Sequence, residues 1–273
     1  MNKKITCGIT GSTGSIGKNL VKNTENFKFI YFKKDITKKR LVENWIKKNK
    51  LDIVVHLAAI VPIKVVNDNK KKAHKVNVCG TKNLVNAILQ NDNNIKWVFF
   101  SSTSHVYSST KLKIKENFTI KPISYYGKTK YLAEKEIMRL KKKDIKFCIG
   151  RIFSTTNTNQ RKDYLVPDLK RKIKKLKEPV ILKNLNHYRD FISVNDISKI
   201  IVNLSKKQYK GIVNIASGKK TKLSEIAQII SNKFKRKIII KENKNPSYLI
   251  ANNNILKRLY RFKIKAKIED LIF

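Results

Sequence analysis

Cysteine is scarce in this chain, and the few cysteines are badly placed for a disulfide framework or a zinc site. Among 273 residues there are only three, Cys7, Cys79 and Cys148, widely spaced and without a Cys-x-x-Cys pair. An odd number at this spacing excludes a disulfide-stapled secreted module and a zinc ribbon, and it is typical of proteins kept in a reducing compartment. We therefore expect a cytoplasmic protein without a metal site.

Long apolar runs are missing as well. The longest, Ile53 to Ile63, is interrupted by His56 and is far shorter than the roughly 18 residues that a membrane-spanning helix needs. The first residues, Met-Asn-Lys-Lys, lead directly into an apolar segment and a glycine-rich loop, so we expect no secretory signal peptide. Apolar residues make up 41% of the chain, which is enough to fill the core of one large or two small domains.

Acidic residues are few compared with basic ones. The chain has 19 Asp and Glu against 62 Lys and Arg, which gives a formal net charge of +43. Such a surplus could neutralise nucleic-acid phosphates. However, 53 of the basic residues are lysines spread along the whole chain, and only nine are arginines, which grip bases and phosphates with two bonds. We therefore attribute the charge mainly to compositional drift in an AT-rich genome and expect no specific nucleic-acid partner. A non-catalytic protein that binds RNA or another polyanion through its basic surface is the alternative.

Short apolar segments alternate with helix-length amphipathic segments through residues 1–153. This alternation, with continuous Val/Ile runs, is typical of a parallel sheet covered by helices on both faces. We expect an α/β fold with a Rossmann-type doubly wound parallel sheet, followed by a smaller C-terminal lobe over residues 154–273, from which the segment 192–216 returns to the first domain. The expected strands are Ile5–Thr10, Phe27–Phe32, Ile53–Leu57, Trp97–Ser101 and Ile145–Ile152, and the expected helices are about 15–25, 36–49, 70–91, 124–143 and 166–176.

The first expected strand leads into a glycine-rich loop, Thr10-Gly11-Ser12-Thr13-Gly14-Ser15-Ile16-Gly17. Gly11 permits a tight turn, Gly14 lets a pyrophosphate approach the backbone, and Gly17 lets helix and strand pack closely. The first N–H groups of the following helix then face the phosphates. Three of the nine glycines lie here, so we predict that residues 1–153 bind NAD or NADP. The expected loop contacts are Gly11, Thr13, Gly14, Ser15, Ile16 and Gly17.

An acidic residue should follow the second strand and hold the adenosine ribose. Asp35 lies 18 residues after Gly17, at the expected spacing, with Ile36 beside it. Asp35 could instead cap the helix that follows. The preceding Lys33 and Lys34 could grip a 2′-phosphate, so the sequence leaves the choice between NAD and NADP open.

Two later segments add chemistry to this domain. The strand Phe99–Ser104 ends in hydroxyl residues, and a helix then begins that places Tyr126 and Lys130 four residues apart, hence on one face. An ammonium group close to a phenol favours the phenolate, so such a Tyr can exchange a proton with a sugar hydroxyl while hydride moves to or from nicotinamide. A hydroxyl from Thr103 would hold the reacting oxygen.

With these motifs in order, the chain resembles the extended short-chain dehydrogenases/reductases, specifically the NAD-dependent epimerase/dehydratase family that acts on nucleotide sugars. The similarity covers nearly the whole chain. The matching motifs are the loop at Thr10–Gly17, Asp-x-x-x-His-x-Ala-Ala at Asp52–Ala59, Asn-Val-x-Gly-Thr at Asn77–Thr81, the Ser-Ser-Thr strand end, Tyr-x-x-x-Lys at Tyr126–Lys130, Arg189–Asp196, and Asn214–Gly218.

The resemblance implies roles for individual residues. Tyr126 is expected to be the general acid/base, Lys130 its partner and a ligand of the nicotinamide ribose, and Thr103 the third member, with Ser102 or Ser104 as alternatives. Arg189 is expected to hold the substrate diphosphate, unless it forms a structural ion pair with Asp190 or Asp196. Further implied contacts are Leu57, Ala58, Ala59, Asn77 and Ser101 for the cofactor, and Ser104 and Phe153 for the substrate.

Departures from the family pattern narrow the expected reaction. Sugar dehydratases of the family carry Asp-Glu directly after the catalytic Thr, whereas this chain has Ser104-His105, so 4,6-dehydration is not expected and His105 is interpreted as a loop residue. Ser154 stands where the family often has an Asn substrate contact. The resemblance implies hydride transfer at C4 of a nucleotide-diphosphate sugar, by a 4-keto-sugar reductase or a 4-epimerase. Family members often form homodimers through the Tyr-x-x-x-Lys helix.

Overall fold

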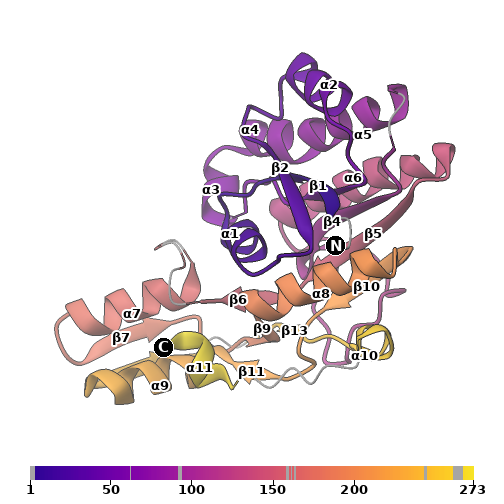
Figure 1. Cartoon of the computed structure of the whole chain (residues 1–273). Helices are drawn as coiled ribbons and strands as arrows, with labels where there is room; N and C mark the ends of the chain where they lie inside the picture. The colour runs from indigo at the N-terminus through magenta and orange to yellow at the C-terminus, as the bar shows by residue number, and fades with distance from the viewer. Residues whose placement is uncertain are drawn as a thin grey trace.

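Two lobes make up the molecule, a larger one built on a parallel sheet and a smaller one that follows it in the chain (Figure 1). The computed structural model describes residues 4–61, 63–91, 94–157, 160, 162, 164–242, 245–260 and 267–273. Within these residues every helix is too short or too polar to cross a bilayer.

The larger lobe contains six parallel strands in the order β10-β5-β4-β3-β1-β2. Because β1 lies between β2 and β3, the chain moves outward on one side of β1 and then reverses, and ligands of such sheets bind at the carboxyl ends next to this reversal. This arrangement confirms the α/β, Rossmann-type prediction. The strands are β1 (Ile5–Thr10), β2 (Phe27–Phe32), β3 (Ile53–His56), β4 (Trp97–Thr103), β5 (Lys146–Ile152) and β10 (Gly211–Ile215).

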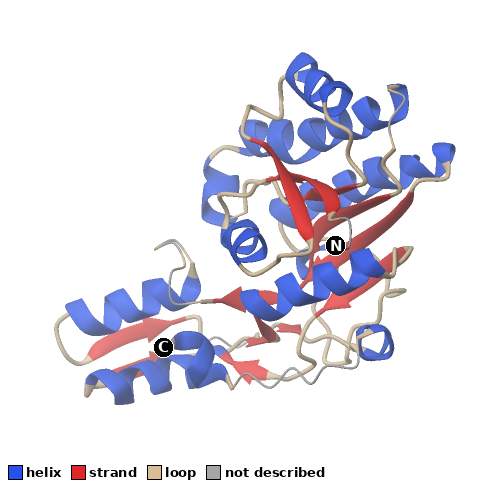
Figure 2. Ribbon diagram, viewed as in Figure 1, coloured by secondary structure: helices blue, strands red, loops and turns tan. Residues whose placement is uncertain are grey.

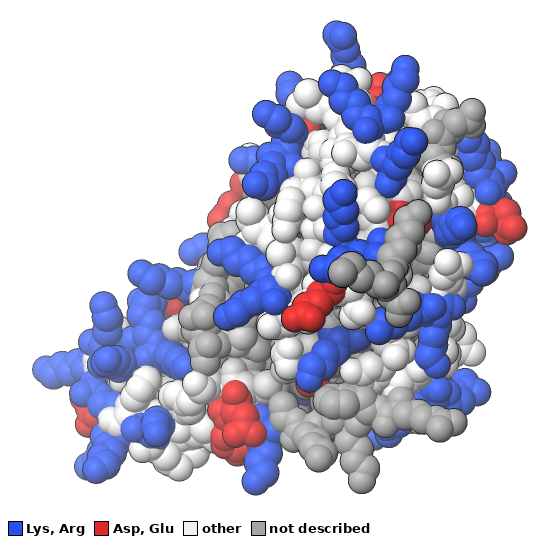
Figure 3. Space-filling model, viewed as in Figure 1, with Lys and Arg blue, Asp and Glu red and all other residues white. Residues whose placement is uncertain are grey.

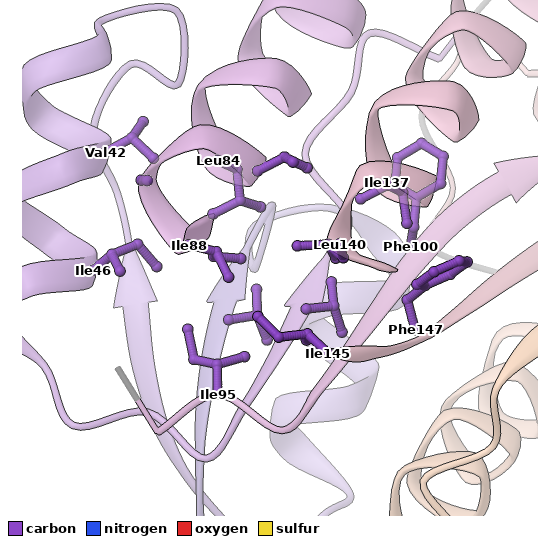
Figure 4. Close-up of a cluster of buried hydrophobic side chains, with 14 of the residues drawn as sticks. Val42, Ile46, Leu84, Ile88, Ile95, Phe100, Ile137, Leu140, Ile145 and Phe147 are labelled. Atoms are coloured by element: carbon purple, nitrogen blue, oxygen red, sulfur yellow. The ribbon is translucent and has the colours of Figure 1, made fainter. Parts of the chain in front are cut away.

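Helices cover both faces of the sheet (Figure 2), because side chains of its inner strands are apolar on both sides. In β4, Val98 and Phe100 pack in the core beneath α2, α5 and α6, whereas Trp97 and Phe99 pack in the core beneath α1 and α8. Figure 4 shows the first core, in which Ile137 and Leu140 lie beside Phe100. The helices are α1 (Ser15–Lys22), α2 (Lys39–Lys48), α5 (Gly80–Gln90), α6 (Tyr125–Met138) and α8 (Val194–Lys206), and a 3-10 turn, η3 (Arg139–Lys143), extends α6.

The helix expected over 70–91 is divided. It consists of α4 (Lys70–His74), a π-helical turn η1 (Lys75–Cys79) and α5, and a further short helix, α3 (Ile63–Asp68), precedes it. Single π turns inside helices often occur at functional sites. Here the turn carries Asn77, whose amide bonds both the N–H and the carbonyl of Ile60 and also the hydroxyl of Thr129. The turn therefore ties the segment after β3 to α6.

The smaller lobe has its own core between α7, α9 and the strand pair β7–β12. Val166 and Leu169 of α7 face Ile226 and Ile230 of α9 in this core. The strand β6 comes directly after β5 in the chain, and β9 pairs with it. From β9 the chain returns through α8 to β10 of the large sheet. The elements are β6 (Ser154–Thr156), α7 (Leu165–Lys175), β7 (Val180–Lys183), β8 (Tyr188–Arg189), β9 (Phe191–Ser193), β11 (Thr221–Lys222), α9 (Leu223–Phe234), β12 (Ile238–Lys241), β13 (Tyr248–Leu249), α10 (Asn254–Leu259) and α11 (Ile268–Ile272).

Positive charge is distributed over both lobes rather than gathered on one face of one element. Figure 3 shows lysine and arginine side chains projecting from the sheet lobe and from the smaller lobe alike. This distribution agrees with a composition that has drifted toward lysine at free surface positions.

Candidate active site

The glycine-rich loop connects β1 to α1 with little space to spare at two of its three glycines. Gly11 has a φ of +72°, and a Cβ there would lie 2.6 Å from the Ala58 nitrogen. A Cβ on Gly17 would overlap the Gly11 carbonyl and lie 2.7 Å from the Ser12 Cα. At Gly14 the closest atom to a Cβ is that same carbonyl oxygen at 3.4 Å, an ordinary contact. Packing thus accounts for Gly11 and Gly17 and leaves the outer side of Gly14 open.

The other predicted loop contacts lie around this open side. Thr13 and Ser15 are exposed and Ile16 is half-buried, at the start of α1. Asn157, which follows β6 of the smaller lobe, donates a hydrogen bond to the Ser15 hydroxyl. The loop therefore lies where the two lobes meet.

A buried hydrogen-bond chain fixes the carboxyl end of β3 against the loop. The Ala58 N–H donates to the Thr10 hydroxyl at 3.2 Å. The same hydroxyl lies 2.6 Å from His56 Nδ1. On the other side of the ring, His56 Nε2 lies 2.9 Å from the Thr81 hydroxyl. Because Thr81 donates to the Asn77 carbonyl, it must accept from His56, so the His56 proton is on Nε2 and Thr10 donates to Nδ1. Burial lowers the pKa of His56 to about 3, which keeps the ring neutral.

No role was predicted for His56, although it interrupts an apolar strand and is the histidine of the Asp-x-x-x-His-x-Ala-Ala motif. The hydrogen bonds of His56 fix the segment Leu57-Ala58-Ala59, which follows β3 directly and is partly exposed. These three residues are the predicted cofactor contacts. The Asn77 carbonyl accepts the hydrogen bond from Thr81, and the Asn77 side-chain amide bonds the backbone of Ile60 and the hydroxyl of Thr129.

Asp35 follows β2 and is exposed. Its carboxylate accepts a hydrogen bond from the Thr37 N–H at 2.9 Å, and this bond is the main reason why the pKa of Asp35 is lowered. The carboxylate closes the turn before α2, while the N-cap of that helix is Lys38. Ile36 is buried against Gly80, where a Cβ would lie 2.7 Å from the Ile36 Cγ2.

Tyr126, Lys130 and Thr103 lie together at the carboxyl edge of the sheet, at the junction of β4 and α6. Tyr126 is 7% exposed and Lys130 is 2% exposed, and the Lys130 Nζ lies 4.2 Å from the centre of the Phe100 ring. The Thr103 side chain lies close enough to the Tyr126 phenol to lower its pKa. The Thr103 hydroxyl accepts from the His105 N–H at 3.3 Å, which leaves its own proton free for a further acceptor.

Electrostatics at this trio differ in one respect from the expectation. Burial raises the pKa of Tyr126, Tyr164 raises it further, and the Thr103 hydroxyl lowers it. Burial lowers the pKa of Lys130 to about 7, and the charge of Glu134 opposes this shift. Lys130 is not among the groups that shift the pKa of Tyr126, so the lowering that the sequence predicted from Lys130 is not found in the protein alone, where burial sets the direction.

The three candidate hydroxyls at the strand end are distinguished by their partners. Ser102 donates to the carboxylate of Glu134, so its hydroxyl is held away from Tyr126. Ser104 is buried in the 3-10 turn η2 (Ser104–Val106), and the half-buried Ser101 precedes both. Thr103 is the residue among these that lowers the pKa of the Tyr126 phenol, which favours it over the two alternatives.

His105 is part of the site wall, not merely a loop residue. Its ring meets the ring of Tyr126 edge-on, with 6.0 Å between centres, and its Nδ1 lies 3.3 Å from the hydroxyl of Ser124, the N-cap of α6. Burial, and to a lesser degree the charge of Arg189, lower the pKa of His105 to about 4. A neutral imidazole therefore faces the phenol.

Arg189 lies close enough to influence His105 and is not paired with an acid. Its guanidinium donates to the carbonyls of Tyr188 and Ser247, at 2.8 and 3.1 Å, and to the Ser247 hydroxyl. Burial lowers the pKa of Arg189 to about 10. Within the residues that the structure describes, no carboxylate pairs with it.

The alternative ion pairs of Arg189 are therefore wrong. The carboxylate of Asp190 accepts from the N–H groups of Ser217, Gly218 and Ala251, and Asp196 bonds Ser193 at the N-terminus of α8. The predicted substrate contact Phe153 is buried and packs on the Tyr107 ring.

No cluster of His, Cys, Asp and Glu suited to a metal occurs among the described residues.

A family model described as GDP-mannose 4,6 dehydratase matches residues 10–263. The chain is an extended short-chain dehydrogenase/reductase. It belongs to the NAD-dependent epimerase/dehydratase family, as its motifs predicted, and hence to a family of enzymes.

Individual relatives agree with this assignment. The chain is 30% identical to the GDP-6-deoxy-D-talose 4-dehydrogenase of Aggregatibacter actinomycetemcomitans, over 96% of this chain and 95% of that protein. Two solved structures share its fold, each over 98% of this chain and 96% of the other. They are RMD from Pseudomonas aeruginosa complexed with NADPH (TM-score 0.87, 17% identity) and the UDP-glucose 4-epimerase of Thermus thermophilus in complex with NAD (0.83, 19%).

Proposed function

We propose that this enzyme transfers hydride between NAD or NADP and C4 of a nucleotide-diphosphate sugar, as a 4-keto-sugar reductase or a 4-epimerase. The observation that carries the proposal is the buried trio Tyr126, Lys130 and Thr103 at the end of β4, beside the glycine-rich loop. A protein that only bound a dinucleotide would have no use for a phenol, a hydroxyl and an ammonium at the same strand end.

The residues present fit a dinucleotide. An added Cβ on Gly14 would meet only the Gly11 carbonyl oxygen, at 3.4 Å, so a diphosphate can approach the backbone there and meet the first N–H groups of α1. Asp35 is charged and exposed after β2, where an adenosine ribose would lie. When bound, the nicotinamide supplies or accepts the hydride.

The chain's own groups handle the proton. In the reducing direction Tyr126 donates its proton to the C4 oxygen, and in the oxidising direction it takes that proton back. The Thr103 hydroxyl, which lowers the pKa of Tyr126, stabilises the resulting phenolate. The ammonium form of Lys130, one turn further along α6, favours the phenolate by charge. Because burial alone disfavours the phenolate, these two groups are needed for Tyr126 to act near neutral pH.

The substrate class follows from Arg189 and from the relatives. Among the described residues the half-buried guanidinium of Arg189 bonds only neutral groups, so it is suited to a diphosphate, which it can bind with two charge-assisted hydrogen bonds. Relatives include a GDP-sugar dehydrogenase and a UDP-glucose epimerase, in agreement with a nucleotide-diphosphate sugar. Ser104-His105 lacks the acid that sugar dehydratases carry there, and a neutral His105 does not replace it. We therefore place the reaction with reduction or epimerisation rather than 4,6-dehydration, in the cytoplasm, with a homodimer as the expected assembly.

A substrate panel tests the proposal. The protein is incubated with GDP-, UDP- and dTDP-sugars and their 4-keto derivatives while the absorbance of reduced nicotinamide and the sugar products are followed. Net consumption of reduced dinucleotide identifies a reductase, whereas product formation with tightly bound NAD and no net consumption identifies a 4-epimerase.

Two tyrosine variants provide the matched comparison. Tyr126→Phe should lower kcat by about 10²- to 10⁴-fold without changing the melting temperature, because it removes the phenol and little packing. The matched control is Tyr125→Phe, one residue earlier on α6. The Tyr125 ring is half-buried beneath the Lys70 ammonium, and this variant should leave kcat unchanged. Full activity in Tyr126→Phe would refute the mechanism.

A further inference from the structure

Glu134 is a charged residue in the core of the large lobe, two turns after Tyr126 and one after Lys130 on α6. It is 0% exposed. Its carboxylate accepts three hydrogen bonds, from Arg151 Nε at 3.0 Å, from Arg151 Nη2 at 2.8 Å, and from the Ser102 hydroxyl. Three adjacent elements, α6, β5 and β4, thus meet at one carboxylate.

All three guanidinium nitrogens of Arg151 donate hydrogen bonds. Its remaining nitrogen, Nη1, donates to the Tyr107 hydroxyl at 2.8 Å and to the Glu116 carbonyl at 3.0 Å. The Tyr107 hydroxyl in turn donates to the Asn214 amide oxygen at 2.9 Å, on β10. The guanidinium is therefore fixed from both sides and holds the Glu134 carboxylate in one orientation.

Stability alone gives no good reason for this pair. Within the described part of the chain it is the only ion pair with both side chains almost fully buried, at 3% and 0% exposure. Removing two charges from water costs about as much as their attraction returns, and apolar pairs of similar volume are often equally stable or more so. The location of the pair is informative, because the third partner of the carboxylate is Ser102, the neighbour of Thr103.

We propose that Glu134 and Arg151 are positioning residues for catalysis, which act through Ser102 to hold the end of β4 in register with α6. Thr103 is the last residue of β4, and its side chain is bonded beyond the strand by the His105 N–H, at 3.3 Å. The Ser102–Glu134 hydrogen bond anchors the preceding residue to the same helix that carries Tyr126 and Lys130. This bond thereby fixes the position of the Thr103 backbone relative to α6, and with it the position of the Thr103 hydroxyl near Tyr126. The inference rests on the proposed function for its catalytic consequence, but not for its geometry.

Ser102→Ala is the variant that tests this idea most cleanly, because it leaves the Glu134–Arg151 pair intact. We expect kcat to fall about tenfold, which corresponds to about 1.4 kcal/mol, while KM for both substrates stays within about twofold. The matched control is Ser198→Ala, which removes an equally buried hydroxyl bonded to the Val194 carbonyl within α8. Its kcat should equal that of the wild type.

A double-mutant comparison tests the route through the carboxylate. Glu134→Gln should lower kcat at least as much as Ser102→Ala, and the double variant should be no slower than Glu134→Gln alone. Independent, multiplying losses would show that Ser102 does not act through Glu134 and would overturn the proposal. Since Glu134→Gln leaves Arg151 without its counter-charge, its unfolding is measured in parallel. If it does not fold, the Ser102→Ala readouts decide.

A readout without turnover separates this inference from the proposed function. In protein labelled with [13Cζ]-tyrosine, the Tyr126 resonance is assigned by its loss in Tyr126→Phe. Ser102→Ala should shift that resonance, because the Thr103 hydroxyl loses its fixed place on the phenol, and Ser198→Ala should not. A Tyr126 resonance unchanged in Ser102→Ala overturns the positioning role. A shifted resonance in a protein that turns over no nucleotide sugar supports the positioning role and refutes the proposed function instead.

Discussion

Alanine at Gly14 should weaken dinucleotide binding, whereas alanine at Gly17 should weaken the fold, because the two glycines have different surroundings. At Gly14 the backbone has a φ of −72° and a ψ of 167°, which any residue adopts, and an added Cβ makes only an ordinary contact. We expect the free energy of unfolding of Gly14→Ala to change by no more than about 1 kcal/mol. The dissociation constant for the dinucleotide should rise at least about tenfold, or about 1.4 kcal/mol, because the methyl group keeps the diphosphate away from the backbone.

Gly17→Ala should instead weaken the fold. The new Cβ would overlap the Gly11 carbonyl and lie 2.7 and 2.9 Å from the Cα and carbonyl carbon of Ser12, all backbone atoms that cannot move aside cheaply. Overpacking of this kind costs about 1–3 kcal/mol, only partly offset by the roughly 0.5–1 kcal/mol that alanine gains over glycine within a helix.

Urea unfolding and fluorescence titration with the reduced dinucleotide measure both quantities on both variants. A Gly14→Ala protein that folds normally and binds the dinucleotide with wild-type affinity would refute the argument, because the open side of Gly14 would then have no ligand to serve. A stable Gly17→Ala protein would show that the loop does not pack as described.

Three further changes probe the rest of the site. Arg189→Met should raise KM for the nucleotide sugar by roughly 10- to 100-fold and leave dinucleotide affinity unchanged, because hydrogen bonds to a charged group contribute about 1.5–3 kcal/mol. Arg171→Met, at an exposed side chain of α7, should change neither, and equal effects of the two variants in steady-state kinetics would contradict the assignment. Asp35→Ala should shift the ratio of kcat/KM values from NAD toward NADP if its carboxylate holds the ribose, and an unchanged ratio would limit Asp35 to closing its turn. His56 has a folded-state pKa of about 3, below its unfolded value, so the unfolded state binds more protons between about pH 3 and 6.5 and His56 makes the protein less stable as pH falls through that window. The urea midpoints of the wild type should therefore fall more steeply from about pH 7 to 4 than those of His56→Gln. Parallel curves would show that His56 is not held neutral.

The sheet was the most predictable part of the molecule. The strands Ile5–Thr10 and Phe27–Phe32 have the predicted bounds, because a strand buried on both faces appears as a continuous apolar run between polar turns. The interruption of the helix over 70–91 by a π turn was missed. Its cause is the tertiary demand on Asn77, which no periodicity of apolar residues reveals.

The candidate site was predictable in its members and less so in its connections. Spacing placed Tyr126 and Lys130 on one helix face, and the family resemblance favoured Thr103 as the third member but left Ser102 and Ser104 as alternatives. That choice depends on which hydroxyl faces the buried Glu134. An acid in the helix expected over 124–143, four residues after Lys130, was visible in the sequence, yet its partner Arg151 comes from a separate strand. Buried polar partners are brought together by the fold, so sequence spacing cannot pair them.

Composition gives one more argument about Lys130. With 53 lysines in the chain, a lysine at any exposed position carries no information, because drift toward this residue is tolerated wherever the ammonium stays in water. The same drift should be strongly opposed in the core, where desolvation of a charge costs several kcal/mol or more, as a rough guide. Among the described residues Lys130 is the only buried lysine, and it forms no ion pair there. A costly lysine at a site where composition does not explain it, one turn from the phenol, is what a catalytic requirement for positive charge would retain.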